Sequence, residues 1–444
     1  MFTRTRVLLC GAILLAGCVP ARAQGAGSDR PFKGALFGGN RPVNSPQSLD
    51  ISLSLLEAYD DDVFAGVGST VSPTSRGVGG YFTALQSGID YKRVSQRLSV
   101  GVSGTSAFRY YPELRKVRSV SHTIGVGFST QLARRTTLSL NQSAAYSPSY
   151  LFGLFPALTV AEPGDAMTAA PDYAASNIES YAYGTTASLT RSFRPRVSAA
   201  VTGDFRYTDY RHESAQQHDV QSSGIAGEVS YQRSKNSRVR LGYRYRDGDL
   251  GTGTVAGSTN EHALDVGVSY SRPVSASRRI FLTFNVGPSA INVLEATDVT
   301  LAPARLYRAA GDVMMGYQSA RAWQARGTYR RGLEFVAGLT RPVFTDAFTA
   351  MVDGLLSSRV DLQMSAGYSS GQSAVSRTAA RFDTYTGTVR LRYALAQSSA
   401  VHIEYLYYFY DFSGYMQPTP GASSRLERNG VRAGLTLQVP ALRR

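Results

Sequence analysis

Hydrophobic and polar residues alternate with a period of two over most of this chain, in segments of roughly ten residues. The segment near the end of the chain shows the pattern best, with apolar Val431, Ala433, Leu435, Leu437 and Val439 interleaved with Arg432, Gly434, Thr436 and Gln438. Side chains of a β-strand point alternately to opposite faces, so this pattern predicts strands with one apolar and one polar face. Similar alternation occurs over 239–246, 280–286, 360–366 and 388–395. A helix would scatter these faces.

About eighteen such segments follow one another, with sixteen as the alternative count. Short connections are expected near 92–95, 134–135, 194–196, 234–237, 275–278, 319–321, 357–358 and 397–399. Longer ones are expected near 60–79, 111–119, 151–178, 211–219, 247–260, 293–304, 337–342, 371–381 and 413–427. Alternating short and long connections are typical of transmembrane barrels, with short periplasmic turns and long extracellular loops. The sequence therefore predicts an all-β, antiparallel, up-and-down transmembrane β-barrel rather than a soluble sandwich.

Aromatic residues support this interpretation by their position. On the apolar faces, tyrosines gather near the predicted segment ends, as at Tyr110, Tyr207 and Tyr245 on one side and Tyr91, Tyr231 and Tyr393 on the other. Membrane barrels carry such girdles at both interfaces. The alternative is that tyrosine is simply a good strand residue.

Composition agrees with one large folded domain. Of 444 residues, 43% are hydrophobic, 11% aromatic and 18% charged, which excludes a disordered chain. No run of eighteen apolar residues occurs, so no helical membrane span is expected. We assign the barrel to residues 49–440, preceded by a flexible periplasmic segment over 24–48.

The first 23 residues read as a secretory signal peptide, because Arg4 and Arg6 precede a short apolar run. Cleavage after Ala23 is favoured, and lipidation at Cys18 is the alternative. The only cysteines, Cys10 and Cys18, lie in this segment, so a chain cleaved at Ala23 contains no disulfide and no thiolate ligand. The cleavage lowers the formal charge from +15 to +12.

The positive charge is spread along the strands rather than gathered in a block, so we expect no nucleic-acid partner. If the apolar faces meet lipid, the opposite faces turn arginines into the lumen: Arg206, Arg240, Arg244, Arg246, Arg308, Arg326, Arg330, Arg390 and Arg392. The cluster of Arg240, Arg244 and Arg246, together with Arg390 and Arg392, is the predicted selective constriction. Rings of arginine attract anions. The alternative is a wall stiffened by ion pairs with acidic residues of the same faces: Asp90, Asp204, Glu228, Asp265, Asp353, Asp361 and Glu404.

Other candidate sites are weaker. The loop over 151–178 either folds inward as a constriction or contacts a partner outside. Histidines are few, and the pairs His212 with Glu213 and His218 with Asp219 fit a solvated loop better than a metal site. His402 and Glu404 share a strand face, but no serine nucleophile can be placed beside them. We expect no enzymatic activity, no metal and no cofactor.

Two short stretches resemble the Gram-negative outer-membrane proteins of the putative β-barrel porin family. The stretch from Leu56 to Phe64 is similar to the strand that opens the barrel in that family, with Asp62 where asparagine is expected. The stretch from Arg432 to Val439 resembles the signal read by the barrel assembly machinery, with Gly434, Leu437 and Val439 at its characteristic positions. It lacks a terminal aromatic residue. The resemblance implies the cell outer membrane, and porin-like transport or an exopolysaccharide system.

Together these features predict a porin-like outer-membrane channel that passes small solutes, with an anion preference set by its arginines. The alternative is an accessory barrel of an exopolysaccharide secretion or assembly system. A barrel hydrolase that uses His402 is the third hypothesis. The expected partners are outer-membrane lipid, the assembly machinery, and small solutes or exported polysaccharide.

Overall fold

The computed structural model describes residues 46–61, 79–112, 117–147, 180–210, 219–250, 257–275, 277–293, 305–319, 323–335, 342–374, 381–412 and 425–443. These residues form a barrel wall of eighteen β-strands: β1 Gln47–Asp60, β2 Gly80–Val94, β3 Leu98–Tyr111, β4 Val117–Ala133, β5 Thr136–Ser147, β6 Ser180–Arg194, β7 Val197–Tyr210, β8 Val220–Gln232, β9 Ser237–Leu250, β10 Gly257–Ser275, β11 Arg278–Val293, β12 Arg305–Ser319, β13 Trp323–Glu334, β14 Val343–Leu355, β15 Val360–Ser373, β16 Arg381–Ala394, β17 Ser399–Asp411 and β18 Arg425–Arg443.

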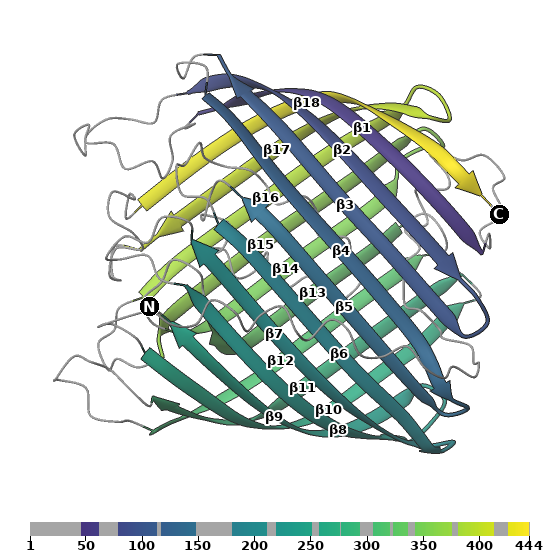
Figure 1. Cartoon of the computed structure of the whole chain (residues 1–444), viewed down its shortest axis with the longest axis vertical. Coiled ribbons are helices and arrows are strands. Elements are labelled where there is room, and N and C mark those ends of the chain that lie inside the picture. Colours follow the sequence, from purple (N-terminus) through teal and green to yellow (C-terminus); the bar gives the residue numbers. More distant parts are fainter. Residues whose placement is uncertain are drawn as a thin grey trace, which may run out of the picture.

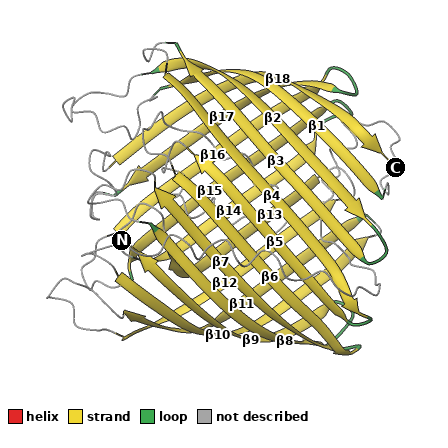
Figure 2. Ribbon diagram, viewed as in Figure 1, coloured by secondary structure: helices red, strands yellow, loops and turns green. Residues whose placement is uncertain are grey.

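The sheet is closed. Every strand pairs antiparallel with its neighbours in sequence, and β1 also pairs with β18 from Ser48 opposite Arg443 to Asp60 opposite Gly430. Figure 1 shows the strands tilted around a wide barrel, and Figure 2 shows that the described part consists of strands and short turns. No helix in the described ranges is long and apolar enough to cross a membrane. The predicted up-and-down barrel and its strand number are confirmed.

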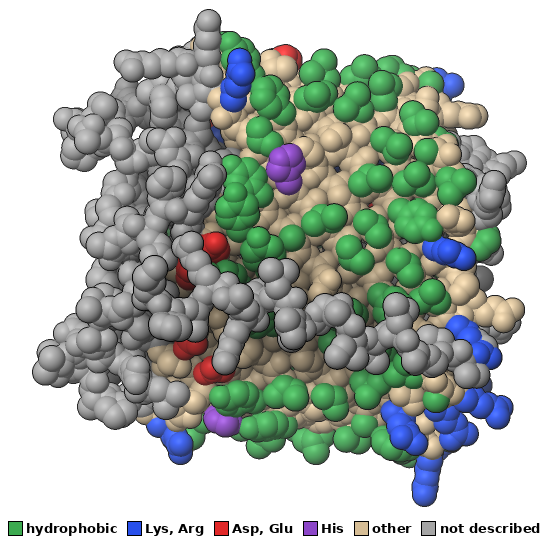
Figure 3. Space-filling model, viewed as in Figure 1, with side chains coloured by type: hydrophobic (Ala, Val, Ile, Leu, Met, Phe, Trp, Pro, Cys, Tyr) green, Lys and Arg blue, Asp and Glu red, His purple; other side chains and the backbone are tan. Residues whose placement is uncertain are grey.

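The predicted apolar faces form the outer surface. In β18, Val431, Leu435, Leu437 and Val439 are all exposed, as are Val239, Leu241 and Tyr243 of β9, Ile280, Leu282, Phe284 and Val286 of β11, and Val389, Leu391 and Tyr393 of β16. In Figure 3 hydrophobic side chains are spread over the visible outer face. An exterior that is apolar from strand to strand is the arrangement expected where the surroundings are hydrocarbon rather than water.

Short turns join the strands along one rim, at the right in Figure 1. All eight predicted short connections fall between consecutive strands, from Val94–Leu98 to Ala394–Ser399. On the other side several strands run further than expected. For example, β9 continues to Leu250 and β10 begins at Gly257, inside the loop predicted over 247–260. We call the two ends the short-turn rim and the long-connection rim.

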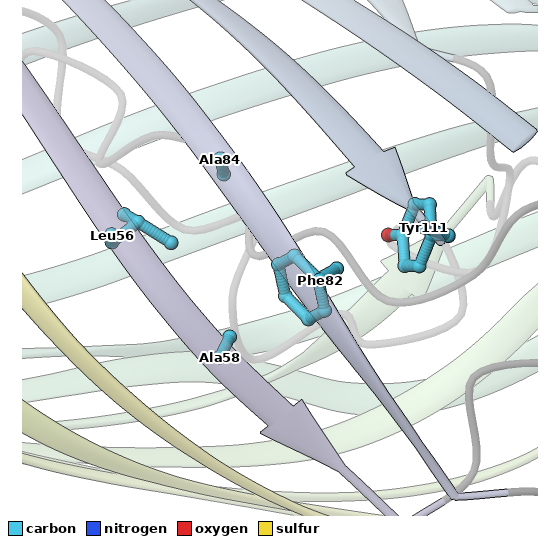
Figure 4. Close-up of a cluster of buried hydrophobic side chains, with 5 residues drawn as sticks. All are labelled: Leu56, Ala58, Phe82, Ala84 and Tyr111. Atoms are coloured by element: carbon cyan, nitrogen blue, oxygen red, sulfur yellow. The ribbon is translucent and has the colours of Figure 1, made fainter. Parts of the chain in front are cut away.

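Buried side chains concentrate inside the barrel, toward the long-connection rim. One apolar cluster joins Leu56 and Ala58 of β1, Phe82 and Ala84 of β2, and Tyr111 of β3 (Figure 4). The rings of Phe82 and Tyr111 lie with their centroids 5.0 Å apart. The lumen is therefore lined by packed side chains over part of its length.

The seam between β1 and β18 carries a buried ion pair at the same end. Arg428 Nε donates to Asp60 Oδ1 and Oδ2 at 2.6 and 2.7 Å, and both side chains are at most 5% exposed. Asn429 adds bonds from its backbone N–H and its side chain to Asp61, at 2.7 and 2.8 Å. These contacts join residues more than 360 positions apart in sequence and close the barrel.

The predicted domain limits stay a prediction. The signal peptide and most of the expected periplasmic segment lie outside the described residues. Strand β1 begins at Gln47, two residues before the predicted barrel limit, and β18 continues through Pro440 to Arg443. Proline has no backbone N–H to donate, and the register between β1 and β18 shifts beside it, at Leu49 and Asp50.

Candidate functional site in the barrel lumen

The strand register turns all of the predicted lumen arginines inward, opposite to the exposed apolar residues that alternate with them. They come from five strands: Arg206 from β7, Arg240, Arg244 and Arg246 from β9, Arg308 from β12, Arg326 and Arg330 from β13, and Arg390 and Arg392 from β16. Six strands separate β9 from β16 along the wall. The arginines therefore fall into two groups along the wall, each with its own electrostatic surroundings, and the predicted constriction stays a prediction.

On β16, each arginine has a carboxylate beside it. Arg390 Nη2 lies 3.1 Å from Glu404 Oε2 on the next strand. Arg392 Nε donates to both oxygens of Asp361, at 3.2 and 3.0 Å, and its Nη2 makes a further contact with Asp361. The two carboxylates are only 11% and 10% exposed. We call these residues the β16 ion pairs. They match the alternative expectation of a wall stiffened by salt bridges.

A polar chain crosses four strands on the other part of the wall. Arg240 of β9 donates from Nη2 to Asn285 Oδ1 of β11 at 2.7 Å, passing over Gly267 of β10. Asn285 Nδ2 in turn donates to both oxygens of Asp312 on β12, at 3.0 and 2.9 Å. A Cβ atom at Gly267 would lie 1.9 Å from Asn285 Oδ1, so glycine is required for this approach.

Nearer the long-connection rim, several arginines surround one carboxylate. Arg330 Nη2 lies 2.9 Å from Glu334 Oε1 on the same strand. Arg206, Arg244 and Arg246 also interact electrostatically with this pair. Two further carboxylates lie near, since Glu261 is 3.9 Å from Arg244 and Asp265 interacts with it. We call Arg206, Arg244, Arg246 and Arg330 the shared arginine cluster, because they share the charge of Glu334.

The end of the β13–β14 hairpin brings Glu334 into this position by leaning across the lumen. Arg246 of β9 donates from Nη1 to the carbonyl oxygen of Leu333 at 2.9 Å, although β9 and β13 are not neighbours in the sheet. Phe335 lies against Gly248, where an added Cβ would come within 2.3 Å of its ring. A small cavity remains between Arg244, Arg246, Asp265, Asp312 and Arg330.

Apolar packing anchors this hairpin end inside the barrel. Leu333 and Phe344 are 1% and 2% exposed and form a cluster with Ile291, Ala310 and Ala374, with Leu306 and Phe335 packed against it. Alternation fails here, since Val343, Phe344 and Thr345 are all buried in succession. We call residues 330–335 and 342–345 the inward hairpin. The longer connection predicted near 337–342 lies, except for Pro342, outside the described residues and stays a prediction.

The loop and the histidines considered as candidate sites are not part of the shared arginine cluster. The loop over 151–178, His212 and His218 lie outside the described residues. His402 and Glu404 face the lumen from β17, opposite Arg392 and Arg390. Within the described ranges no three metal-ligating side chains come together. Glu404 is engaged by Arg390, which fits its role in the wall.

The predicted assembly residues lie on the last strand. Leu437 and Val439 are exposed on the outer face, at 42% and 56%. Gly434 lies where β18 meets both neighbours, and a Cβ there would be 2.7 Å from the carbonyl oxygen of Leu55 and 2.8 Å from His402 Cε1. The close contacts at this seam therefore require a glycine at position 434 for steric reasons. The role of Gly434 in assembly stays a prediction.

Some inward charged residues were not predicted. These are Arg109, Arg428 and the acidic residues Asp60, Glu261, Asp312 and Glu334. The same alternation rule identifies Arg109, which lies between the outward Phe108 and Tyr110. Alternation also places Glu334 on the face of Arg326 and Arg330, but its approach to β9 depends on the hairpin leaning inward.

Known proteins give the following comparison. No family model matches the sequence, and no curated protein matches it. Solved structures with a similar arrangement include OpdQ of Pseudomonas aeruginosa, with 9% identity, 89% of this chain and 98% of that chain covered, and a TM-score of 0.42. OccK2 of the same organism, solved with glucuronate, has 8% identity, coverages of 89% and 98%, and a TM-score of 0.44. The ferric-catecholate import receptor Fiu of E. coli has 9% identity, coverages of 90% and 82%, and a TM-score of 0.41.

Proposed function

We propose that this protein is an outer-membrane channel that passes small hydrophilic solutes and prefers anions. The apolar exterior fits a bilayer, where only closed barrels satisfy the backbone hydrogen bonds of strands. Barrels of sixteen to eighteen strands are wide enough to hold an aqueous channel. The proposal therefore takes the lumen, rather than the outer surface, as the place where selectivity arises.

The shared arginine cluster is the observation that carries the anion preference. Four guanidinium groups act on the carboxylate of Glu334, and guanidinium keeps its charge at every physiological pH. The neighbouring cavity is lined by Arg244, Arg246, Arg330 and Arg331 and by only two carboxylates, Asp265 and Asp312, so a small anion there meets more positive than negative groups. A cation there meets like charge, which disfavours its passage.

The inward hairpin extends into the lumen toward β9, so solutes that cross the barrel pass close to the shared arginine cluster. Strand β13 stops pairing with β12 at Arg331, and the residues beyond it bring Glu334 toward β9, where Arg246 holds Leu333. The β16 ion pairs contribute less, because each of their arginines is matched by its own carboxylate. Selectivity is therefore assigned to the part of the lumen between β7 and β13.

The test is conductance of the refolded mature protein in a planar bilayer under a potassium chloride gradient. We expect stable conductance steps and a reversal potential of the sign that corresponds to a preference for chloride over potassium. A membrane-inserted, heat-modifiable barrel without conductance would overturn the channel assignment and favour the accessory role in polysaccharide export. Stable steps with potassium preference would overturn the anion preference alone.

A further inference from the structure

The short-turn rim is strongly basic over five consecutive turns. The segments 92–97, 131–136, 191–197, 231–238 and 271–279 join β2 to β3, β4 to β5, β6 to β7, β8 to β9 and β10 to β11. They contain no aspartate or glutamate and carry these basic residues: Lys92, Arg93, Arg97, Arg134, Arg135, Arg191, Arg194, Arg196, Arg233, Lys235, Arg238, Arg272, Arg278 and Arg279. We call these five turns the basic arc.

The rest of this rim differs. The turn from β14 to β15 carries only Arg359, and the segment 394–399 between β16 and β17 has no charged residue. In Figure 3, Lys and Arg side chains gather along the lower part of the right-hand rim. The basic arc is therefore confined to one side of the barrel, although all turns on this rim are short, with two to four residues between the strands.

Part of the basic arc points outward rather than along the barrel axis. Tyr91, Tyr231 and Tyr270 lie on the outer face near the ends of β2, β8 and β10, and an arginine follows each of them two residues later on the same face. These arginines are Arg93, Arg233 and Arg272, and all three are exposed. Two residues of strand span about 7 Å.

This spacing matches the profile of a membrane surface. Tyrosine rings gather at the level where hydrocarbon meets head groups, and the next outward position along the strand lies at the level of the phosphates. Guanidinium binds phosphate through two parallel hydrogen bonds. A soluble polyanion would instead need arginines directed into the periplasm, past the end of the wall.

We propose that the basic arc binds the phosphate groups of anionic phospholipids in the periplasmic leaflet. The inference rests on the proposed membrane location and is independent of the solute that the lumen passes. It makes the lipid layer around this barrel asymmetric, with anionic lipid held along β2 to β11 and no such preference along β14 to β17.

Bromolipid quenching of a single tryptophan tests this directly. Trp323 is the only tryptophan in the chain, so W323F provides a silent background. Y231W places a reporter within the basic arc, and Y393W places the matched reporter near the uncharged 394–399 segment; the two tyrosines are 48% and 42% exposed on the outer face. Each full-length mature variant is refolded into phosphatidylcholine vesicles containing brominated phosphatidylglycerol or brominated phosphatidylcholine.

We expect the reporter of the Y231W variant to prefer phosphatidylglycerol by about three- to tenfold, since each basic residue near an anionic surface contributes on the order of 1 kcal/mol. The reporter of the Y393W variant should show almost no preference between the two lipids. Adding R196Q, R233Q and K235Q to the Y231W variant should remove the preference, and 1 M salt should reduce it, because the Debye length then falls to about 3 Å.

Each outcome has one meaning. Equal quenching of the Y231W reporter by both lipids overturns the inference while leaving the membrane location intact. Absence of quenching by either lipid in both reporter variants overturns the membrane location itself. Unchanged lipid preference in the R196Q/R233Q/K235Q variant, with loss of binding to dextran sulfate, also overturns the inference and identifies the arc as a site for a soluble polyanion.

Discussion

The β16 ion pairs and the shared arginine cluster use the same residue in opposite ways. On β16, Arg390 and Arg392 each face a carboxylate on an adjacent strand, at hydrogen-bonding distance. In the shared cluster, Arg206, Arg244, Arg246 and Arg330 act together on Glu334. The first arrangement cancels charge within the wall. The second gathers four arginines about Glu334, with Glu261 and Asp265 as further carboxylates nearby.

The difference shows that an inward arginine does not by itself indicate an ion-binding lumen. What decides is the number of carboxylates within reach, and this depends on which strands lie side by side. The arginines of the β16 ion pairs contribute to the stability of the wall. The arginines of the shared arginine cluster contribute to the electrostatic potential inside the lumen. Variants in the two groups should therefore fail in different ways.

The largest effect on stability is expected from breaking a β16 ion pair. R392Q leaves the Asp361 carboxylate, 10% exposed, without its guanidinium partner, and should lower the free energy of unfolding by about 3 kcal/mol. R244Q should cost less, about 1 kcal/mol, because Arg244 approaches the buried Glu261 only to 3.9 Å and Glu261 keeps the hydrogen bond from Ser289 at 2.6 Å. Unfolding by guanidinium chloride in vesicles measures the free energy of unfolding of both variants.

The D361N/R392Q double variant is the control, and it should recover part of the stability that R392Q loses. Equal losses in R392Q and R244Q would contradict the comparison.

A somewhat smaller loss is expected from G267A. The added methyl group would meet Asn285 Oδ1 at 1.9 Å and break the bond from Arg240, at a cost of about 1–3 kcal/mol. G227A is the matched control, because a Cβ at Gly227 has no neighbour within 4 Å. If both alanine variants unfold at the same denaturant concentration, the polar chain across β9 to β12 does not stabilise the wall.

Widening the lumen at the inward hairpin should change conductance rather than stability. F335A removes the ring that lies against Gly248 and should raise single-channel conductance, by less than about twofold, because a narrow part of the pathway opens. The control is F284A, which shortens an outward side chain that is 41% exposed. Unchanged conductance in F335A would show that the inward hairpin does not limit the flow of ions.

The smallest effect is expected from Glu334 alone. E334Q removes the carboxylate on which the shared arginine cluster acts, so the lumen becomes more positive and chloride preference should rise by a fraction of its value. D353N offers a comparison at another inward carboxylate, which accepts a bond from Gln324 at 3.1 Å. A fall in chloride preference in E334Q would contradict the assignment.

The strands of the barrel wall were predicted well because each shows the period-two alternation of apolar and polar residues, which is visible in the local sequence. Period-two alternation fixed the outward faces of Leu435 and Leu437 and the inward faces of Arg240 and Arg390, and turn composition located the short connections. The inward hairpin was missed because it breaks that rule. Leu333 and Phe344 are apolar residues that look like outer-face residues, but they are buried by contacts with β11 and β12.

Charge pairing was predictable only in part. Glu228, Asp361 and Glu404 were recognised on the inward faces, and each lies near an arginine of a neighbouring strand. Some partners are reached across an intervening strand. Arg240 reaches Asn285 only because Gly267, which lies between them, has no side chain, and the alternation pattern does not predict this contact. The predicted constriction of Arg240, Arg244 and Arg246 with Arg390 and Arg392 stays a prediction, and the sheet order shows only that β9 and β16 are not adjacent strands.

The most direct test of the account is the reversal potential of two arginine variants under one salt gradient. R244Q/R246Q/R330Q removes three members of the shared arginine cluster, and R390Q/R392Q/D361N/E404Q removes both β16 ion pairs without changing the net charge. Insertion and heat-modifiability of each variant serve as the folding control. We predict that the first variant loses most of the chloride preference of the natural protein and that the second keeps it. Loss in the second with retention in the first would contradict the central claim.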